Sequence, residues 1–351
     1  MAQICTPNYG TNGYAYTVTT QSELDMIATE CTTVNGSIII GTNYTGSFSL
    51  PNVRNITSQF WMEGRPISLS TSAPASIDIP DLEFLGDGLF LRDLQILTNF
   101  SAPKLRTVRL VTMDHAQSVD LRSLEGAESL DIIGNITSLQ LDSLKHVRQR
   151  CRICNVDLCN QRITPTTSFD LSLPSLETVG RANFVGRLLS LNVPKLSNII
   201  GDGTRFSSLL LVTSGNTINI SFPQLSSVNE TIELKGSIGS LSMPKLKIIP
   251  KDFIVNSYVP LDINLPFQEA GYIDLSGNIS SVQFPNLRSL SSGQITSDLN
   301  IDCDFIKTTI SNGTNATDNV YCNSNSGPRL LVDVKAAVSV VIVVVGLLIT
   351  L

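Results

Sequence analysis

The sequence predicts an all-β solenoid, a column of stacked coils with a short helix capping its N-terminal end. Three observations predict it. A nine-residue pattern recurs along most of the 351 residues, a second apolar run follows many of its copies, and the residue at the centre of each copy is polar. A repeat of roughly 20 to 30 residues with apolar residues at fixed positions is typical of solenoids, because one coil cannot bury its apolar row alone.

The pattern reads apolar, any, apolar, Pro, any, Leu, any, any, apolar, and residues 220–228 are a clean copy. Apolar residues two apart indicate a short strand with both side chains turned inward. Proline then ends the strand, because it has no N–H to give to the ladder. Pro266 opens a damaged copy, since Gln268 stands at the Leu position. The other copies carry Pro51, Pro80, Pro103, Pro174, Pro194, Pro223, Pro244 and Pro285, or Arg122 and Asp142 in place of proline.

A second short apolar run in many coils, as in residues 89–91, 209–211, 232–234 and 273–275, indicates that each coil supplies two or more strands to parallel sheets. The residue between the two apolar positions of the pattern is expected to face the solvent. It is polar in every copy: Ser49, Asp78, Ser101, Asp120, Gln140, Ser172, Asn192, Ser221, Ser242, Asn264 and Gln283.

A short helix is expected near the N-terminus, where Ser22-Glu23-Leu24-Asp25 has the form of a capping box and the helix would run through Ala28. We assign residues 1–36 to an N-terminal cap and residues 37–305 to the solenoid, whose first strand would begin at 36–40. Cys5 and Cys31 are predicted to form a disulfide that fastens the cap, in preference to two free buried thiols.

The longest interval between copies, 32 residues, contains Cys151, Cys154 and Cys159. A zinc site needs four ligands, and only a distant His146 could join these three cysteines. A redox dithiol would lie between a strand and a helix, which the residues after Cys154 do not indicate. A loop pinned by a disulfide is therefore predicted, with the unpaired one of the seven cysteines here. If the array has two lobes, their boundary is expected near 148–165.

The C-terminus has the arrangement of a signal for a glycosylphosphatidylinositol (GPI) anchor. Residues 336–351 carry no charge but are shorter than the about 20 residues that a spanning helix needs. Small residues and a spacer precede them, so residues 328–351 are predicted to be removed on maturation. Asn325 is the preferred attachment residue, with Asn323 and Ser324 as runners-up. A simple C-terminal membrane anchor is the alternative.

Residues 306–327 are rich in Asn, Ser, Thr and Gly and are interpreted as a glycosylated linker between solenoid and anchor. Cys303 and Cys322 flank most of it and are predicted to pair and close the last coil. Met1 to Cys5 show no secretory signal, so the assignment to the cell surface depends on the C-terminus and on ten glycosylation sequons. The sequons are Asn35, Asn43, Asn55, Asn99, Asn135, Asn219, Asn229, Asn278, Asn312 and Asn315.

Taken in order, the cap with Cys31, the repeated Pro-x-Leu coils, the flanking cysteines and the GPI-type end resemble fungal GPI-anchored cell-wall organisation proteins. These proteins are of the sporulation-specific and extracellular-mutant type, related in fold to the receptor L-domain. The resemblance covers roughly residues 5 to 351. It implies a right-handed parallel β-helix, similar to a leucine-rich-repeat solenoid, and a surface glycoprotein needed for wall assembly without known catalytic activity. The chain departs from this family's pattern in showing no signal peptide and in its cysteine cluster at 151–159.

No catalytic, cofactor-binding or metal-binding residue is predicted. Glycoside hydrolysis needs two facing carboxylates, but Asp78, Asp120 and Asp170 lie in alternate coils. A nucleophilic triad needs a histidine, and only His115 and His146 exist, without a Gly-x-Ser-x-Gly elbow. The acidic residues Glu83, Glu125 and Glu177 share the position after Leu, again not in consecutive coils, and are interpreted as solvated turn residues.

The favoured function is therefore non-enzymatic scaffolding or recognition in fungal cell-wall organisation, at the outer leaflet of the plasma membrane through a GPI lipid, in the cell wall, or both. The expected partners are wall glucan or wall-building enzymes. A net charge of −6 argues against nucleic acid. The alternative is an ectodomain that binds a glycan or peptide, with aromatic residues near 60–62. A glycan-active hydrolase or transglycosylase is the weaker alternative.

Overall fold

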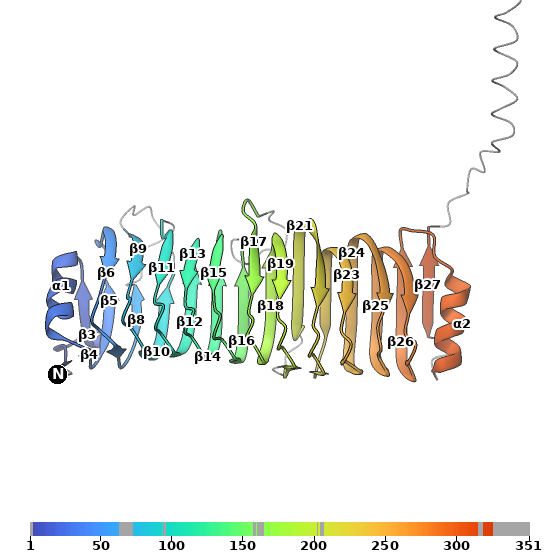
Figure 1. The fold of residues 1–351 in the computed structure, drawn as a ribbon, viewed down its shortest axis with the longest axis horizontal. Coiled ribbons are helices and arrows are strands. Elements are labelled where there is room, and N and C mark those ends of the chain that lie inside the picture. The colour runs from blue at the N-terminus through green and yellow to red at the C-terminus, as the bar shows by residue number, and fades with distance from the viewer. Residues whose placement is uncertain are drawn as a thin grey trace, which may run out of the picture.

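Parallel strands of successive turns lie side by side along the described part of the chain (Figure 1). The computed structural model describes residues 3–62, 73–92, 94, 96–156, 159, 165–201, 203, 207–314 and 319–325. These residues form a β-solenoid of about 12 turns that is 56% strand and 7% helix, which confirms the predicted all-β solenoid.

The largest sheet forms one wall of the solenoid and the bend that leads into it. Its strands pair in parallel from one turn to the next, and among the described strands only β2(Tyr9–Gly10) pairs antiparallel, with β3. The sheet contains β1(Ile4–Cys5), β3(Gly13–Val18), β4(Thr33–Val34), β5(Ser37–Ile40), β7(Asn55–Ile56), β8(Phe60–Met62), β10(Phe84–Leu91), β12(Thr107–Asp114), β14(Gly126–Ile133), β16(His146–Cys154), β18(Thr178–Gly186), β20(Asn198–Ile199), β21(Leu209–Ser221), β22(Ser227–Val228), β23(Ile232–Ser242), β24(Ile248–Asn264), β25(Glu269–Gln283), β26(Ser289–Ser297) and β27(Val320–Ser324).

The second wall consists of the short strands that precede the proline of each copy. They form a five-stranded sheet of β6(Gly46–Ser49), β9(Pro74–Asp78), β11(Asn99–Ser101), β13(Ser118–Asp120) and β15(Ser138–Gln140), followed by the pair β17(Phe169–Ser172) and β19(Leu188–Asn192). From β21 onward the second wall is formed by the C-terminal parts of the long strands, as in the pairing of Ile220 with Leu241.

The recurring pattern has the predicted roles. Both apolar positions around each central residue are buried in every copy, except that Leu139 is partly buried. None of the eleven polar central residues is buried. A tight turn follows the proline, as where the Leu105 N–H donates to the carbonyl oxygen of Ala102 at 3.1 Å. The second apolar runs lie in β10, β21, β23 and β25.

The copy at Pro266 is shortened rather than damaged. Gln268 does not occupy the Leu position, because the turn is one residue shorter and Phe267 points into the core with 0% exposure. Its ring centroid lies 5.0 Å from that of Phe253 and 5.8 Å from that of Phe284. An aromatic side chain thus fills the volume that a leucine fills in the neighbouring coils.

The N-terminal cap contains the expected helix, α1(Gln21–Glu30), with Leu24 and Ile27 buried. The predicted capping box at Ser22 and Asp25 is wrong, because the N-cap is Thr20 and Glu23 is its partner. The Glu23 carboxylate accepts from the Thr20 N–H at 3.0 Å, which satisfies a helix-terminal donor. The prediction that the first strand begins at 36–40 is also wrong, since β1 to β4 precede it.

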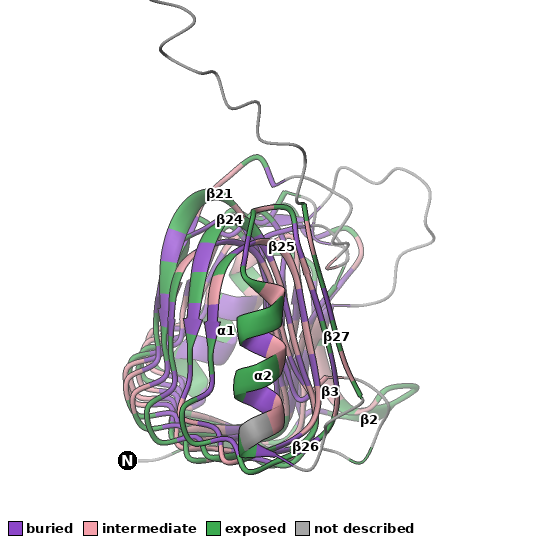
Figure 2. Cartoon of the chain, turned by 90° about the vertical axis from the view of Figure 1, so that its right-hand side faces the viewer, coloured by how far each residue is buried: buried purple, intermediate pink, exposed green. Residues whose placement is uncertain are grey.

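The predicted linker at 306–327 is wrong over most of its described residues. Helix α2(Cys303–Gly313) covers the C-terminal end of the solenoid (Figure 2), with the Asp302 carboxylate accepting from the Phe305 N–H at 2.9 Å. Strand β27 then pairs in parallel with β26 and forms the last rung. Composition suggested a linker, but Ile306 and Ile310 are one helical turn apart and both buried.

All seven cysteines lie within the described residues. Cys5 is bonded to Cys31 and Cys303 to Cys322, the two pairs named from the sequence. Cys154 is bonded to Cys159 beside a small apolar cluster with Val156, Val185 and Val212, apart from the main core. The main core continues unbroken from Val18 to Cys322, and β16 pairs with β18 across the long interval, so the solenoid is not divided there.

Cys151 is the free cysteine. Burial, and to a smaller extent the charge of Asp131, raises the pKa of the Cys151 thiol to about 12. A buried and protonated thiol is a poor nucleophile. We expect iodoacetamide to leave the folded protein unlabelled and to label one cysteine after unfolding without a reductant. Labelling of the folded protein at the rate of a free cysteine would contradict the buried position.

Candidate functional site

The described surface has an open groove at the bend of the large sheet. The register breaks there between β10 and β12, between β14 and β16, and between β16 and β18. Such breaks bend strands and redirect side chains. In each coil the bend separates a short segment of the strand, such as Thr107 and Val108, from the longer segment that forms the wall.

The groove has a volume of about 770 Å³ and crosses the five strands β10, β12, β14, β16 and β18. Its floor is low because Gly86 and Gly126 have no side chains and Ala127 has a small one. Phe84, which is 40% exposed, lies among the residues from β10. The polar lining consists of Arg106, Thr107, Arg109, Glu125, Glu128, His146, Arg148 and Thr178.

A charge ladder of alternating sign runs along one side of the groove. It is built from the residue after the Leu of each copy, whose N–H donates to the carbonyl of the same residue one coil earlier, as Arg106 does to Glu83 at 2.9 Å. Lys145 pairs with Glu125 at 3.4 Å (Nζ to Oε2). Arg54 lies 3.9 Å from Glu83 (Nη1 to Oε1), the next residue of the ladder. The ladder is Arg54, Glu83, Arg106, Glu125, Lys145 and Glu177.

A second ladder runs along the bend itself. Arg109 donates from Nε to Asp87 at 2.7 Å and from Nη1 to Glu128 at 3.2 Å. Gln59 donates to Asp87 and Gln149 donates to Glu128, each at 2.6 Å. The hydrogen bond from Gln59, together with those from Arg109, lowers the pKa of Asp87. The second ladder therefore presents fixed donors and acceptors in five successive coils.

The charged side chains that line the groove differ in whether they are already paired. The two carboxylates of the groove are each engaged by a cation, Glu125 by Lys145 and Glu128 by Arg109. Within the described part of the chain, no ion pair involves Arg106 or Arg148, so both guanidinium groups can donate to a ligand. The described residues also contain no cluster of three or more His, Cys, Asp or Glu side chains that could hold a metal ion.

The acidic residues considered from the sequence are placed apart. Asp78 and Asp120 each pair with Ser101, which lies between them, so they are not in adjacent coils. Arg122, at the proline position of its copy, donates from Nη2 to Asp120 at 2.6 Å. Sequence reasoning found the shared position of Glu83, Glu125 and Glu177 and missed the cations between them, which the residue after each Leu could have shown.

The aromatic residues near 60–62 do not form an exposed patch. Phe60 and Met62 are buried in β8, and Trp61 alone is half-exposed, paired in register with Phe90. This part of the surface therefore offers less to a ligand than the groove does.

Most sequon asparagines that the structure describes are accessible. Asn312 lies in α2 with no side chain described, and Asn315 and residues 328–351 lie outside the described residues. Of the candidates for anchor attachment, Asn323 and Asn325 are exposed and Ser324 is half-buried. The exposed sequon residues are Asn35, Asn43, Asn135, Asn219 and Asn229, and the half-buried ones are Asn55, Asn99 and Asn278.

The chain is similar to Protein ecm33 of Aspergillus fumigatus. The two are 22% identical over 322 residues, which span 85% of this chain and 77% of that protein. This distant similarity confirms the resemblance to the extracellular-mutant type of fungal cell-wall protein. No family profile matches the chain, and no solved structure matches it significantly.

Proposed function

We propose that this protein is a non-enzymatic, GPI-anchored surface glycoprotein that acts in fungal cell-wall organisation by scaffolding or recognition. The observation that carries the proposal is the similarity to Protein ecm33, which extends over most of both chains. That similarity indicates a fungal cell-wall protein. The finer assignment, to the outer leaflet and to a scaffold, draws on the C-terminal sequence and on the fold.

The fold supports a scaffold because its two ends are closed. Helices α1 and α2 lie at opposite ends of the column, and each is joined to the coils by a disulfide, through Cys31 and Cys303. Capping of the terminal repeats keeps a solenoid soluble and prevents it from stacking on other copies. Among the described residues no helix has the length and apolar character to cross a membrane.

Phosphatidylinositol-specific phospholipase C is expected to release the protein from intact cells, because it cleaves the lipid of a GPI anchor. The measurement is the fraction of protein in the medium by immunoblot, before and after treatment. A variant with Asn323, Ser324 and Asn325 all changed to the bulky residue Leu should lose this release, because the attachment site requires small residues. Retention of the wild type in both the membrane and wall fractions after treatment would contradict the GPI anchor.

An ectodomain that binds a ligand is the second candidate function. The groove favours it, because the groove joins two ordered charge ladders to an exposed aromatic ring within five adjacent strands. Recognition by this groove and scaffolding by the column are compatible, since the groove lies on the side of the solenoid and leaves both ends unchanged.

A further inference from the structure

We propose that the groove across β10, β12, β14, β16 and β18 binds a strand of an uncharged, hydroxyl-rich polysaccharide. The inference rests on the proposed function, since it names the ligand class through which a wall protein would recognise its surroundings. The proposal follows from the charges of the groove, from its repeating geometry, and from where the sequons lie.

The charges of the groove favour an uncharged ligand rich in hydroxyl groups. Its lining has three guanidinium groups and two carboxylates in alternating order, so a polyanion or polycation would meet repulsion at every second coil. A hydroxyl group both donates and accepts hydrogen bonds, so it suits either side chain. Arg106 offers donors, Glu125 offers acceptors, and the exposed ring of Phe84 offers an apolar face to a sugar ring.

Equivalent side chains repeat along the groove at a regular spacing, as the units of a polymer do. Neighbouring strands lie about 4.8 Å apart, so the five strands place equivalent side chains over roughly 19 Å. The spacing is held by the backbone, because each residue of the first ladder bonds to its equivalent in the previous coil, as Glu125 does to Arg106 at 3.0 Å. A chain of similar sugar units can therefore make the same contacts repeatedly with little ordering cost to the protein.

The sequons leave this part of the bend open. Asn55 lies beside Phe84 at the N-terminal end of the groove, and Asn229 follows β22 beyond its C-terminal end. Within the chain from 84 to 198 the sequons are Asn99 and Asn135. Asn99 lies in β11 of the second wall, and Asn135 lies at the turn after β14 toward that wall. Glycans at these positions would border the groove without filling it.

The proposal is tested by calorimetric titration of the full-length chain in detergent with a soluble, uncharged glucan oligosaccharide. Thr107→Trp places a large ring in the groove from an exposed strand position, and a second variant combines Arg106→Ala with Arg148→Ala. We expect each to weaken binding by roughly tenfold or more, because each removes or blocks several hydrogen bonds. A melting curve equal to that of the wild type shows that the variants fold.

Two controls carry single changes of the same kinds at equivalent positions outside the groove. Ser289 pairs with Glu269 and occupies the position in its coil that Thr107 occupies in the groove. Arg288 occupies the position of Arg106, because its N–H donates to the carbonyl of Gln268 at 2.8 Å. Ser289→Trp and Arg288→Ala are expected to change binding by less than about twofold. The proposal is overturned if the wild type does not bind the oligosaccharide, if the controls weaken binding equally, or if only a sulfated polyanion or a peptide binds.

This titration separates the two proposals. Binding in detergent does not depend on how the chain is attached to the cell, so loss of phospholipase release would leave the groove proposal standing. Conversely, an anchored protein that binds no oligosaccharide would keep the proposed location and lose the recognition role of the groove.

Discussion

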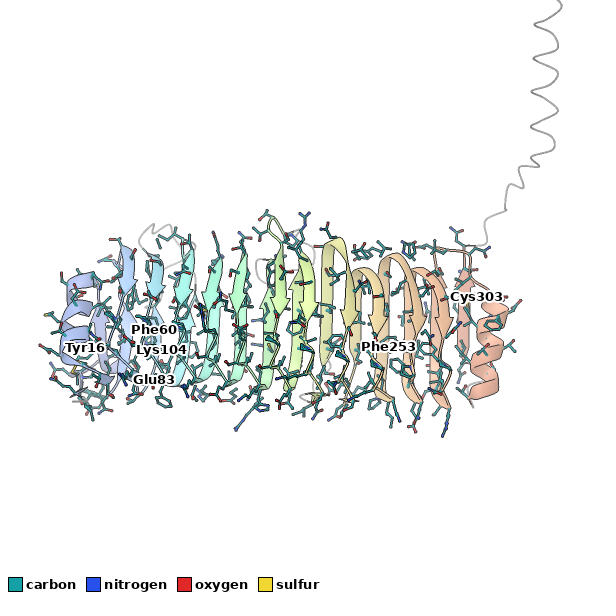
Figure 3. All side chains as sticks on the ribbon, in the orientation of Figure 1. Tyr16, Phe60, Glu83, Lys104, Phe253 and Cys303 are labelled. Atoms are coloured by element: carbon teal, nitrogen blue, oxygen red, sulfur yellow. A yellow bond between two sulfur atoms is a disulfide. The ribbon has the colours of Figure 1, made fainter. Side chains whose placement is uncertain are left out.

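Phe267→Ala is expected to lower the free energy of unfolding by about 3–5 kcal/mol, the usual cost of truncating a buried aromatic side chain to alanine. Phe267 has 0% exposure and lies between Phe253, which is labelled in Figure 3, and Phe284 in the core. Its ring is nearly perpendicular to that of Phe253, at 82°, and stacked on that of Phe284, at 17°. Truncation would leave a cavity and remove ring contacts to the coils on both sides.

The effect is expected to be local in space as well as large. In a solenoid each coil contacts only its neighbours, so weakening one interface allows the coils on its two sides to unfold separately. Urea unfolding followed by hydrogen exchange should show β25 to β27 opening before the coils on the N-terminal side. Phe305→Ala is the matched control, because Phe305 is 59% exposed and its loss should cost within about 0.5 kcal/mol. Equal destabilisation by both variants would contradict the assignment of Phe267 to the core.

Phe267 also shows how far the repeat could be predicted from sequence. The apolar positions before each proline define the strands regardless of context, because a period of two places both side chains on one face. The turn after Pro266 is shorter by one residue, and a fixed template then assigns the Leu position to Gln268. The volume that must be filled decides which side chain turns inward, and that volume is set by neighbouring coils.

The C-terminal cap was hidden by composition for a related reason. Residues 303–313 are rich in polar residues, and their helix depends on two buried isoleucines and on the Asp302 N-cap. Both signals are present in the sequence, but their stabilising effect comes from the end of the solenoid that they cover. A helix of this length gains most of its stability from such packing.

The groove could be predicted only in part. From Glu83 to Glu177 the sequence shows a charged residue after each Leu, but the pairing of coils decides that opposite charges become neighbours. The second ladder is less visible still, because Asp87 and Arg109 stand beside register breaks that shift them relative to the repeat. Irregular positions of this kind are the ones that a periodic pattern omits, and here they form a wall of the candidate site.

Asn155→Ala is expected to lower the free energy of unfolding by roughly 2–4 kcal/mol, because it leaves the partners of two part-buried hydrogen bonds unpaired, at about 1–2 kcal/mol each. The side chain has 0% exposure. Its Nδ2 donates to the Thr167 carbonyl at 2.8 Å, and its Oδ1 accepts from the Arg187 N–H at 2.9 Å. One amide thus joins the end of the long interval to the coil that follows it.

Asn192→Ala is the matched control for this prediction, because Asn192 is exposed and its amide reaches only the Ser172 hydroxyl in the opposite strand. Its cost should stay within about 0.5 kcal/mol in the same urea experiment. Gly186 gives an independent check, since its φ is +152° and an added Cβ would lie 1.9 Å from the Asn155 Oδ1. Gly186→Ala should therefore destabilise the wild type strongly but cost less in the Asn155→Ala background, where that oxygen is gone. Additive costs in the double variant would show that Asn155 does not hold this junction.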